Sequence, residues 1–439
     1  MIWYLSLTLI LGGVVVVMAL GVPVAFAFLV VTTIGVYALQ GGSGAFLQLI
    51  LSIYSSVSSY ALVPIPLFIL MGVVLWHSNI GQQAVDAIDK WIGRVPGRLS
   101  LLTIASGSVF SALSGSTMAN TAMLGSLLMP QMTKRGYSLG MSMGPIMAGG
   151  GLAMMIPPSA LAVILASIGK ISIAKVLIAA IVPGILMAIL YTIYIVIRAV
   201  RRPDEAPSYT VAATSTGEKL LAVAKYLLPL GLIIFSVSGL IVLGVATPNE
   251  AAALGAISSL LLAAAYRKLT WSLLKKSLLD SVKITAMTFA IMAAATGFSQ
   301  ILAFSGATRG LLDTVLGLQV SPIVLVIGMN LIVLFLGCFM DQIAIMLITL
   351  PIFMPIVNSL GLDPIWFAII MLVNLETALM TPPFGLLLFI MKGVAPANTT
   401  FGQIYASAMP YVLLNIVAMA LLIAFPTLVS SVLASLGLG

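Results

Sequence analysis

Charged residues are scarce in this sequence: Asp, Glu, Lys and Arg make up only 7% of its 439 residues, whereas hydrophobic residues make up 61%. Soluble domains carry roughly 25% charged residues, so the composition excludes an ordinary soluble fold. The single cysteine, Cys338, excludes a disulfide framework. One histidine, and no P-loop, H-E-x-x-H motif, cysteine cluster or Ser/His/Asp set, argues against an enzyme, against ATP hydrolysis and against a bound cofactor.

Long apolar runs replace the missing charge. Runs of about 17 to 25 residues, the length that crosses ~30 Å of hydrocarbon, recur along the whole chain. They predict an all-α, polytopic membrane protein. The net charge of +8 sits mainly in short loops between these runs, where it reports orientation in the membrane and indicates no nucleic-acid partner.

An internal repeat is indicated by prolines at a constant offset of 225 residues: Pro157 corresponds to Pro382, Pro130 to Pro355 and Pro23 to Pro248. An offset shared by most of each half predicts two repeats. We expect a first repeat over 1–198, a polar cytoplasmic linker over 199–220 and a second repeat over 221–439.

Basic residues then predict the topology, because cytoplasmic loops are enriched in Lys and Arg. The segment between Arg98 and Lys134 starts and ends on the basic side and is interrupted at Gly115, so we expect a re-entrant hairpin near 98–130. The first half has five predicted spans, an odd number, so we expect the second half to be inverted relative to the first. Its hairpin, near 321–355, would then enter from outside. The whole fold would have about ten spans and two hairpins, with the N-terminus outside the cytoplasm.

Two double prolines interrupt runs that are otherwise long enough to span the membrane, near 139–168 and near 362–391. A proline in a helix interior removes a hydrogen bond and costs about 3 kcal/mol. Broken backbone at membrane depth is tolerated where it is buried in protein or lines a wet cavity. Freed carbonyls suit a cation such as Na⁺, and half-helix N-termini suit a carboxylate.

Several blocks of sequence resemble the large membrane subunit of TRAP (tripartite ATP-independent periplasmic) transporters, the DctM-like family. They are "GSVFSALSGSTMANTAMLGSLLMPQMTKRGYS", "GGGLAMMIPPS", "ATPNEAAALGA", "GCFMDQIAIMLITLPIFMPI" and "LETALMTPPFG", in that order over nearly the whole chain. The family usually has glycine where Ala378 stands, which puts the backbone approach beside Glu376 in question.

The resemblance implies an elevator fold of the ion-transporter superfamily in a bacterial inner membrane, with a periplasmic N-terminus. It implies Na⁺-coupled import of organic acids, of the C4-dicarboxylate or sialic acid type, delivered by a periplasmic binding protein. A small four-helix membrane subunit is the other implied partner, and we expect it to be a separate chain. The alternatives are an ion-coupled carboxylate or anion permease that needs no binding protein, or a channel or membrane scaffold.

Polar residues and glycines at the hairpin tips and breaks are the candidate ligands. The Na⁺-binding candidates are Ser114, Gly115, Ser116, Asn120, Gly151, Gly337, Asp341, Thr377 and Thr381. The substrate-binding candidates are Ser116, Pro157, Pro158, Ser159, Pro382 and Pro383. For the polar members a structural role competes: Ser, Asn and Asp cap half-helices, and Thr hydroxyls bond to their own helix.

Other ionisable residues receive different interpretations. Glu376 is a second carboxyl at apparent membrane depth and has either a functional or a structural role. Glu250 follows "TP" and predicts a capping box with Thr247. We expect His77 to lie at a span end without a catalytic or metal-binding role. No basic residue is expected at membrane depth, and Trp271 to Asp280 predict an interfacial amphipathic helix.

Overall fold

A computed structural model describes residues 3–40, 43–93, 95–207, 215–317 and 320–437. The described residues form helices and short helical turns, and no strand occurs among them. A helix pairs its backbone N–H and C=O groups with one another except in its first and last turns, which suits it to lipid. Seven of the described helices are long and apolar enough to cross a membrane: Tyr60–His77, Ile173–Arg201, Thr216–Val242, Pro248–Ala265, Trp271–Phe304, Gln342–Ser359 and Phe401–Ala424. Five more apolar helices are shorter.

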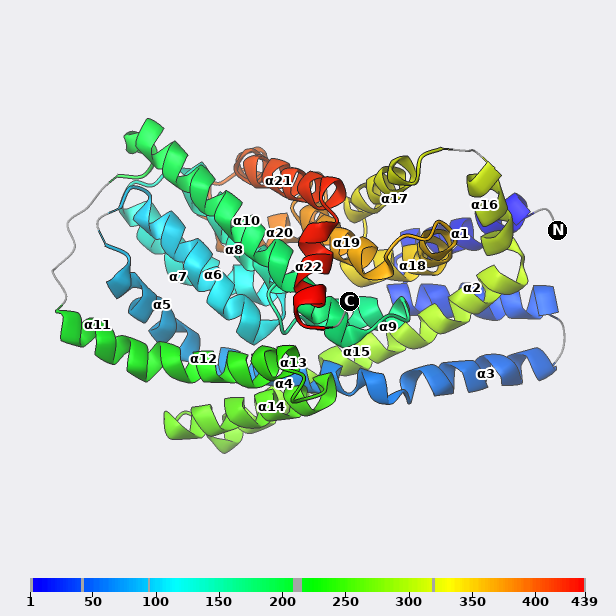
Figure 1. Cartoon of the computed structure of the whole chain (residues 1–439), viewed down its shortest axis with the longest axis horizontal. Helices are drawn as coiled ribbons and strands as arrows, with labels where there is room; N and C mark the ends of the chain where they lie inside the picture. Colours follow the sequence, from blue (N-terminus) through cyan, green and yellow to red (C-terminus); the bar gives the residue numbers. More distant parts are fainter. Residues whose placement is uncertain (1–2, 41–42, 94, 208–214, 318–319, 438–439) are drawn as a thin grey trace.

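The helices fall into two sets, a support layer, part of which follows the lower edge of Figure 1, and a hairpin layer that contains both proline breaks. The support layer contains α1 (Trp3–Ala19), α2 (Val24–Gln40), α3 (Ser43–Val57), α4 (Pro64–His77), α5 (Ile80–Trp91), the rod α11 to α13 (Thr216–Val242), α14 (Pro248–Ala265), α15 (Trp271–Phe304) and α16 (Ala307–Gly317). Within it, α4 packs between α14 and α15, and α15 also contacts α2 and α3. The rod, α14, α15 and α3 follow the lower edge of Figure 1.

The hairpin layer contains the remaining helices. They are α6 (Arg98–Ser114), α7 (Thr117–Lys134), α8 (Leu139–Gly151), α9 (Ala160–Ile168), α10 (Ile173–Arg201), α17 (Pro322–Gly337), α18 (Gln342–Ser359), α19 (Pro364–Leu379), α20 (Leu386–Val394), α21 (Phe401–Ala424) and α22 (Thr427–Ser435). Here α6 and α7 pack on α8, and α17 packs on α19.

Both double prolines separate two helices. After α8, a 3₁₀ turn over Leu152–Met154 leads to the cis peptide Pro157–Pro158, and α9 begins at Ala160. After α19, the cis peptide Pro382–Pro383 leads to α20. The second break requires glycine at 385, because a Cβ there would lie 2.3 Å from the carbonyl oxygen of Leu379. Each break therefore ends one half-helix and starts another inside the hairpin layer.

The structure differs from the sequence expectations at three places. Residues 271–304 form one helix of 34 residues, with no separate interfacial helix, because neither Gly nor Pro occurs before Gly297. The apolar run over 406–435, which the sequence would allow as one continuous helix, is divided by Pro426 into α21 and α22, since the residue before a proline is pushed out of the helical region. The polar linker is shorter than expected: α10 continues to Arg201 and α11 starts at Thr216, and residues 208–214 lie outside the described part.

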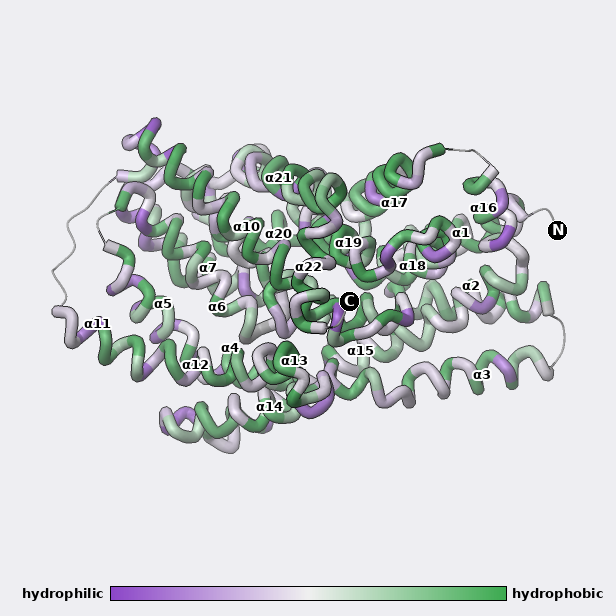
Figure 2. The backbone as a smooth tube through the Cα atoms, in the orientation of Figure 1, coloured by the Kyte–Doolittle hydropathy of each residue, from purple (hydrophilic) through white to green (hydrophobic). Residues whose placement is uncertain are grey.

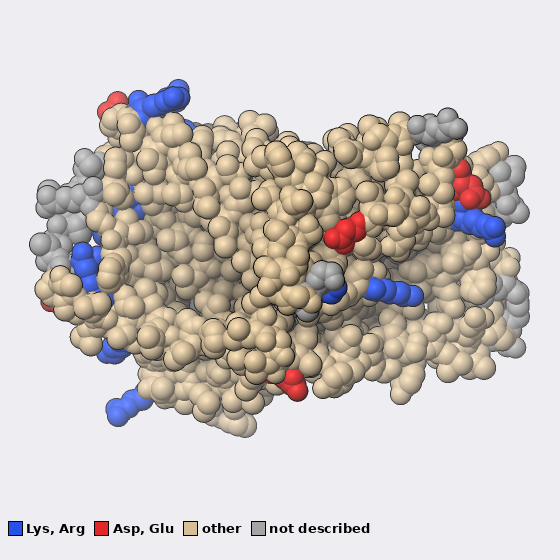
Figure 3. All heavy atoms as spheres, in the orientation of Figure 1, with Lys and Arg blue, Asp and Glu red and all other residues tan. Residues whose placement is uncertain are grey.

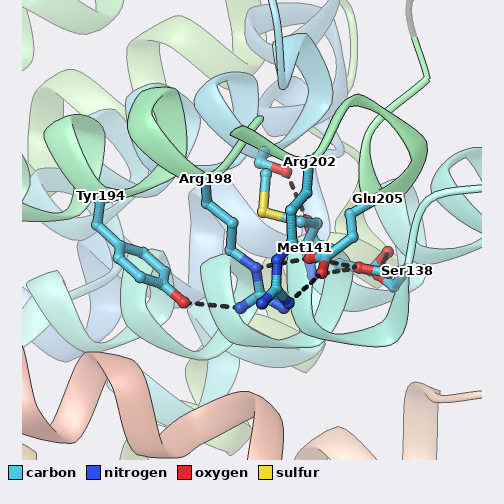
Figure 4. A network of polar contacts seen from close by, with 8 residues as sticks. Ser138, Met141, Tyr194, Arg198, Arg202 and Glu205 are labelled. Carbon is cyan, nitrogen blue, oxygen red and sulfur yellow. Dashed lines mark hydrogen bonds and ion pairs between the residues drawn. The ribbon is translucent and has the colours of Figure 1, made fainter. Parts of the chain in front are cut away.

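A polar cluster closes the end of α10 (Figure 4). The carboxylate of Glu205 accepts a hydrogen bond from Arg198 Nε at 2.6 Å and one from Arg202 Nη1 at 3.0 Å. Arg198 also donates to the Tyr194 hydroxyl at 2.7 Å, and the Ser138 backbone N–H donates to the Glu205 carbonyl at 2.8 Å. Burial acts to raise the pKa of Glu205, but the hydrogen bonds from the two arginines outweigh it and lower that pKa. The cluster ties the start of α8 to the end of α10.

The surface has the polarity of a membrane protein. Apolar residues cover much of α10 and the α11 to α13 rod (Figure 2), where large side chains such as Ile189, Ile193, Leu232 and Phe235 are exposed. Lys and Arg gather mainly at one end of the face drawn in Figure 3. An exposed apolar belt with charge toward the ends fits a multi-pass membrane protein.

Candidate functional site

A cavity of about 630 Å³ lies between the two layers. Its support-layer wall is formed by α4 and α15, including His77, Asp280 and Lys283. Its hairpin-layer wall is formed by the first turns of four helices: α7 at Gly115 to Ala119, α9 at Ala160 and Leu161, α18 at Asp341 to Ile343, and α20 at Leu386. Both hairpin tips and both broken helices therefore meet at one cavity.

All four helices present their N-terminal ends to this cavity, and three of those ends are capped by a side chain. Ser116 accepts a hydrogen bond from Ala119 N at 3.4 Å, and Ser159 accepts one from Ala162 N at 3.3 Å. Asp341 accepts two, from Ile343 N at 2.9 Å and Ala344 N at 3.1 Å. A helix N-terminus carries about half a positive charge, so four of them make this wall attractive to an anion.

The first tip is held against the first break. Gly115 has φ +57°, a conformation that favours glycine, and a Cβ there would lie 3.2 Å from the Pro158 carbonyl oxygen. Beneath the tip, the amide nitrogen of Asn120 lies 3.2 Å from the Gly107 carbonyl oxygen and 3.4 Å from those of Gly149 and Gly150. Asn120 thus joins α6, α7 and the end of α8.

Oxygen atoms are concentrated around Asn120. Its Oδ1 and the hydroxyl of Thr121 are buried and have no hydrogen-bond partner among the described residues. Thr121 lies directly against Gly150, where an added Cβ would come within 1.8 Å of its hydroxyl oxygen. Carbonyl, amide and hydroxyl oxygens are the ligands that a hard cation prefers. The residues at this tip therefore fit a Na⁺ ion.

A buried carboxyl lies in the last turn of α19, just before the second break. Glu376 is 0% exposed, and neither of its carboxyl oxygens has a hydrogen-bond partner among the described residues. It abuts Gly151 at the end of α8, where an added Cβ would lie 1.6 Å from Glu376 Oε1. The neighbouring hydroxyls of Thr377 and Thr381 donate to the carbonyls of Val373 and Thr377. Two half-helices from different parts of the chain meet at this carboxyl.

Ala378, where the resembling family usually has glycine, is accommodated from the opposite side. Gly337, the last residue of α17, faces it, and a Cβ on Gly337 would lie 2.1 Å from the Ala378 Cβ. The glycine at 337 therefore provides the close approach that the alanine at 378 would otherwise prevent. This contact gives Gly337 a packing role next to the second tip.

The remaining predicted residues have different positions. Pro157 and Pro158 line a separate narrow groove against Val237 and Ser238 of the rod, and they are not among the residues that line the large cavity. Ser159 is buried as the cap of α9. The Pro383 carbonyl accepts a hydrogen bond from the Tyr405 hydroxyl at 2.9 Å, and Pro382 precedes it in the break. The side chain of Ser114 lies outside the described part.

Sequence reasoning missed the support-layer wall. Lys283 lines the cavity twelve residues into α15, about 18 Å from the start of that helix. His77 Nε2 lies 3.0 Å from Asp280 Oδ2, although the two residues are 203 positions apart. The absence of helix breakers between Trp271 and Lys283 was the available signal.

Glu250 has the structural role that its motif predicts. Its carboxylate accepts a hydrogen bond from the Thr247 backbone N–H at 2.8 Å, and its own N–H donates to the Thr247 hydroxyl at 3.3 Å. This reciprocal pair is a capping box at the start of α14. The prediction of a capping role is confirmed.

Comparison with known proteins adds to this geometry. Residues 11–428 match the family described as tripartite ATP-independent periplasmic transporter, DctM component. The C4-dicarboxylate TRAP transporter large permease protein DctM of Pseudomonas aeruginosa is 33% identical over 380 residues, 86% of this chain and 87% of that protein. The ectoine TRAP transporter large permease protein TeaC of Halomonas elongata is 30% identical over 423 residues, 95% of this chain and 97% of that protein.

A solved structure, that of the YdaH transporter of Alcanivorax borkumensis, has a similar fold. Its TM-score is 0.67 at 15% sequence identity, covering 88% of this chain and 89% of that one. The resemblance carried by the hairpin and double-proline motifs is confirmed, and the relatives are permeases, which are not enzymes. The chain belongs to the DctM family, the large membrane permease component of tripartite ATP-independent periplasmic transporters.

Proposed function

We propose that this chain is the permease of a Na⁺-coupled importer of organic acids and that the acid binds in the cavity between the two layers. The single observation that carries the proposal is the convergence of four helix N-termini on one cavity wall. Such ends bind carboxylates without a lysine or arginine beside them. C4-dicarboxylate and sialic acid are the two proposed substrate types. The names of two relatives specify C4-dicarboxylate and ectoine, both of which carry a carboxylate.

Na⁺ would be held beneath the tips. At the first tip, the proposal is supported by the unpartnered oxygens of Asn120 and Thr121 beside the carbonyls of Gly149 and Gly150. At the second tip, the proposed ligands are the carboxylate of Asp341, the backbone carbonyl of Gly337 and the hydroxyl oxygens of Thr377 and Thr381. A bound Na⁺ supplies positive charge next to the half-helix N-termini, so it strengthens the binding of an anion in the same cavity.

The proposed transport step is an elevator movement of the hairpin layer against the support layer. Two inverted repeats, which the proline offset predicts, would give the hairpin layer two equivalent positions, one open to each side. The narrow groove lined by Leu177 and Ile178 on one layer and Val237 and Ile241 on the other is largely apolar. One hydrogen bond crosses it, from the Ser238 hydroxyl to the Pro157 carbonyl at 3.0 Å, so sliding would break few directional bonds. The anion-binding wall of the cavity would be carried along because its four helix N-termini belong to the hairpin layer.

The proposed partners are a small four-helix membrane subunit and a periplasmic substrate-binding protein, and the proposed location is a bacterial inner membrane with the N-terminus in the periplasm. The family description names one component of a tripartite system, which supports two further components. Exposed apolar residues on α1 to α3, among them Leu9, Val16, Ile34 and Leu47, leave surface for lipid or for a membrane partner.

Uptake into proteoliposomes tests the proposal. The chain and its small membrane partner are reconstituted and offered radiolabelled succinate, ectoine or sialic acid, with and without the binding protein and an inward Na⁺ gradient. We expect uptake of at least one acid that requires both. Na⁺-driven uptake without the binding protein would indicate the alternative permease class, and downhill flux without Na⁺ would indicate a channel.

A further inference from the structure

The support-layer wall of the cavity has a charge arrangement that the proposed function leaves unused. Among the described residues that line the cavity, Lys283 is the single lysine or arginine. Its side chain is 76% exposed, and its Nζ lies 3.9 Å from Asp280 Oδ1, at the outer limit of an ion pair. A lysine held this loosely keeps most of its four-carbon reach.

Asp280 has a closer partner than Lys283. His77 Nε2 lies 3.0 Å from Asp280 Oδ2, and the His77 side chain is only 15% exposed on the neighbouring helix α4. The His77–Asp280 contact links α4 to α15 and engages one carboxylate oxygen, Oδ2, whereas Lys283 lies near the other, Oδ1. Asp280 therefore orients Lys283 without neutralising it closely.

The other acidic residue of the cavity is also occupied. Asp341 lies across the cavity on the tip of the second hairpin, where its Oδ1 accepts two backbone hydrogen bonds from the first turn of α18. Its charge is partly offset by the helix end that it caps, and the Na⁺ proposed at this tip would offset the rest. The cavity therefore has two separate positive regions, the helix N-termini on one wall and the Lys283 ammonium on the other.

Resting on the proposed function, we propose that Lys283 is a specificity-determining residue that binds the second carboxylate of a dicarboxylic acid whose first carboxylate lies at the half-helix N-termini. A dianion joins the two walls, because it satisfies both positive regions at once. A monocarboxylate of the same length satisfies only the hairpin-layer wall. The assignment also links binding to movement, since the two carboxylates are held by different layers.

A reporter cysteine in the cavity tests this assignment without requiring transport. Met287 lines the cavity one helical turn after Lys283 and is 63% exposed. In the full chain with Cys338→Ser and Met287→Cys, reaction with a negatively charged thiol reagent is followed in Na⁺ buffer with increasing succinate or butyrate. We expect succinate to slow the reaction at lower concentrations than butyrate.

Adding Lys283→Met is expected to raise the succinate concentration for half-protection about tenfold, the effect of losing one charge-assisted hydrogen bond, and to leave butyrate unchanged. Lys276→Met, on the same helix but outside the cavity, is the matched control and should change neither. Asp280→Asn removes the anion beside Lys283 and should lower the succinate concentration for half-protection. If these residues merely supported the packing of α15, Lys283→Met and Asp280→Asn would not shift the half-protection concentration of succinate in opposite directions.

The inference is overturned if Lys283→Met leaves protection by succinate unchanged, or if it weakens protection by succinate and by butyrate equally. It is also overturned if succinate gives no protection in the parent chain with Cys338→Ser and Met287→Cys alone. Failure of the proposed function has a different signature. In that case succinate protects the reporter and depends on Lys283, but the parent chain shows no Na⁺-driven uptake.

Discussion

Asp341 has two separable properties, a helix cap and a negative charge at the cavity. Asn is as good an N-cap as Asp, whereas Ala loses about 1 kcal/mol. Asp341→Asn should therefore preserve both capping bonds of α18 and change only the charge. Asp341→Ala should remove the cap as well.

The stability effects are small for a chain of 439 residues. With an unfolding entropy of about 2.1 cal/mol/K per residue, 1 kcal/mol corresponds to about 1 °C in the unfolding midpoint. We expect Asp341→Asn to unfold at the wild-type temperature and Asp341→Ala to unfold about 1 °C lower. Neither value would explain a large loss of transport.

The effect on Na⁺ should be much larger. Two unit charges about 4 Å apart interact by about 4 kcal/mol at an effective dielectric constant of about 20. A third of that value, about 1.4 kcal/mol, is already a factor of ten in affinity. We therefore expect Asp341→Asn to raise the Na⁺ concentration for half-maximal uptake at least tenfold.

The assay is uptake into proteoliposomes at a series of external Na⁺ concentrations, with thermal unfolding measured on the same preparations. Asp363→Asn is the matched control, because Asp363 caps α19 in the same way, with Ile365 N as donor at 2.8 Å, but does not line the cavity. An unchanged Na⁺ dependence in Asp341→Asn, or an equal change in Asp363→Asn, would refute a cation role for Asp341.

Three further predictions concern other contacts. Ser116→Ala should lower stability by about 1 kcal/mol through the lost cap and weaken the Na⁺ response of uptake, and a normal response would leave this tip with a structural role only. Gly151→Ala should overpack the contact with Glu376 and cost about 1–3 kcal/mol. Adding Glu376→Ala to Gly151→Ala should recover part of that cost in thermal unfolding. Gly328→Ala is the control, because a Cβ there would have open space around it. If the costs of Gly151→Ala and Glu376→Ala simply added in the double variant, the contact between the two residues would be contradicted. Glu205→Gln should destabilise the chain at pH 7 but not in acid, because a carboxylate with a lowered folded-state pKa stabilises above its ordinary pKa and loses this effect as the pH falls through the lowered value. An equal difference at pH 7 and pH 3 in unfolding midpoints would argue against that ion pair.

Local rules account for the parts of the hairpin layer that the sequence predicts. Gly115 breaks an apolar run and adopts φ +57° between α6 and α7. The double prolines separate α8 from α9 and α19 from α20 because a proline ring cannot continue a helix. The capping box of Thr247 and Glu250 follows from a motif of four residues. Each of these features is specified within one or two helical turns.

Contacts between distant segments could not be predicted in this way. The meeting of His77 with Asp280, of Gly151 with Glu376 and of Gly337 with Ala378 depends on tertiary packing. Lys283 resembled a loop residue because basic residues precede it at positions 267, 268, 275 and 276. Only the uninterrupted helix α15 carries it into the cavity.

Locking the two layers together tests the central claim, Na⁺-driven transport by movement of the hairpin layer, most directly. Ile178 and Ser238 line the same narrow groove from opposite layers, so Ile178→Cys and Ser238→Cys in the Cys338→Ser background can be joined by a short bis-maleimide. With the small membrane partner and binding protein present, the account predicts Na⁺-driven succinate uptake before cross-linking and in each single-cysteine control after treatment, but none in the cross-linked pair. Full uptake by the cross-linked pair would contradict it.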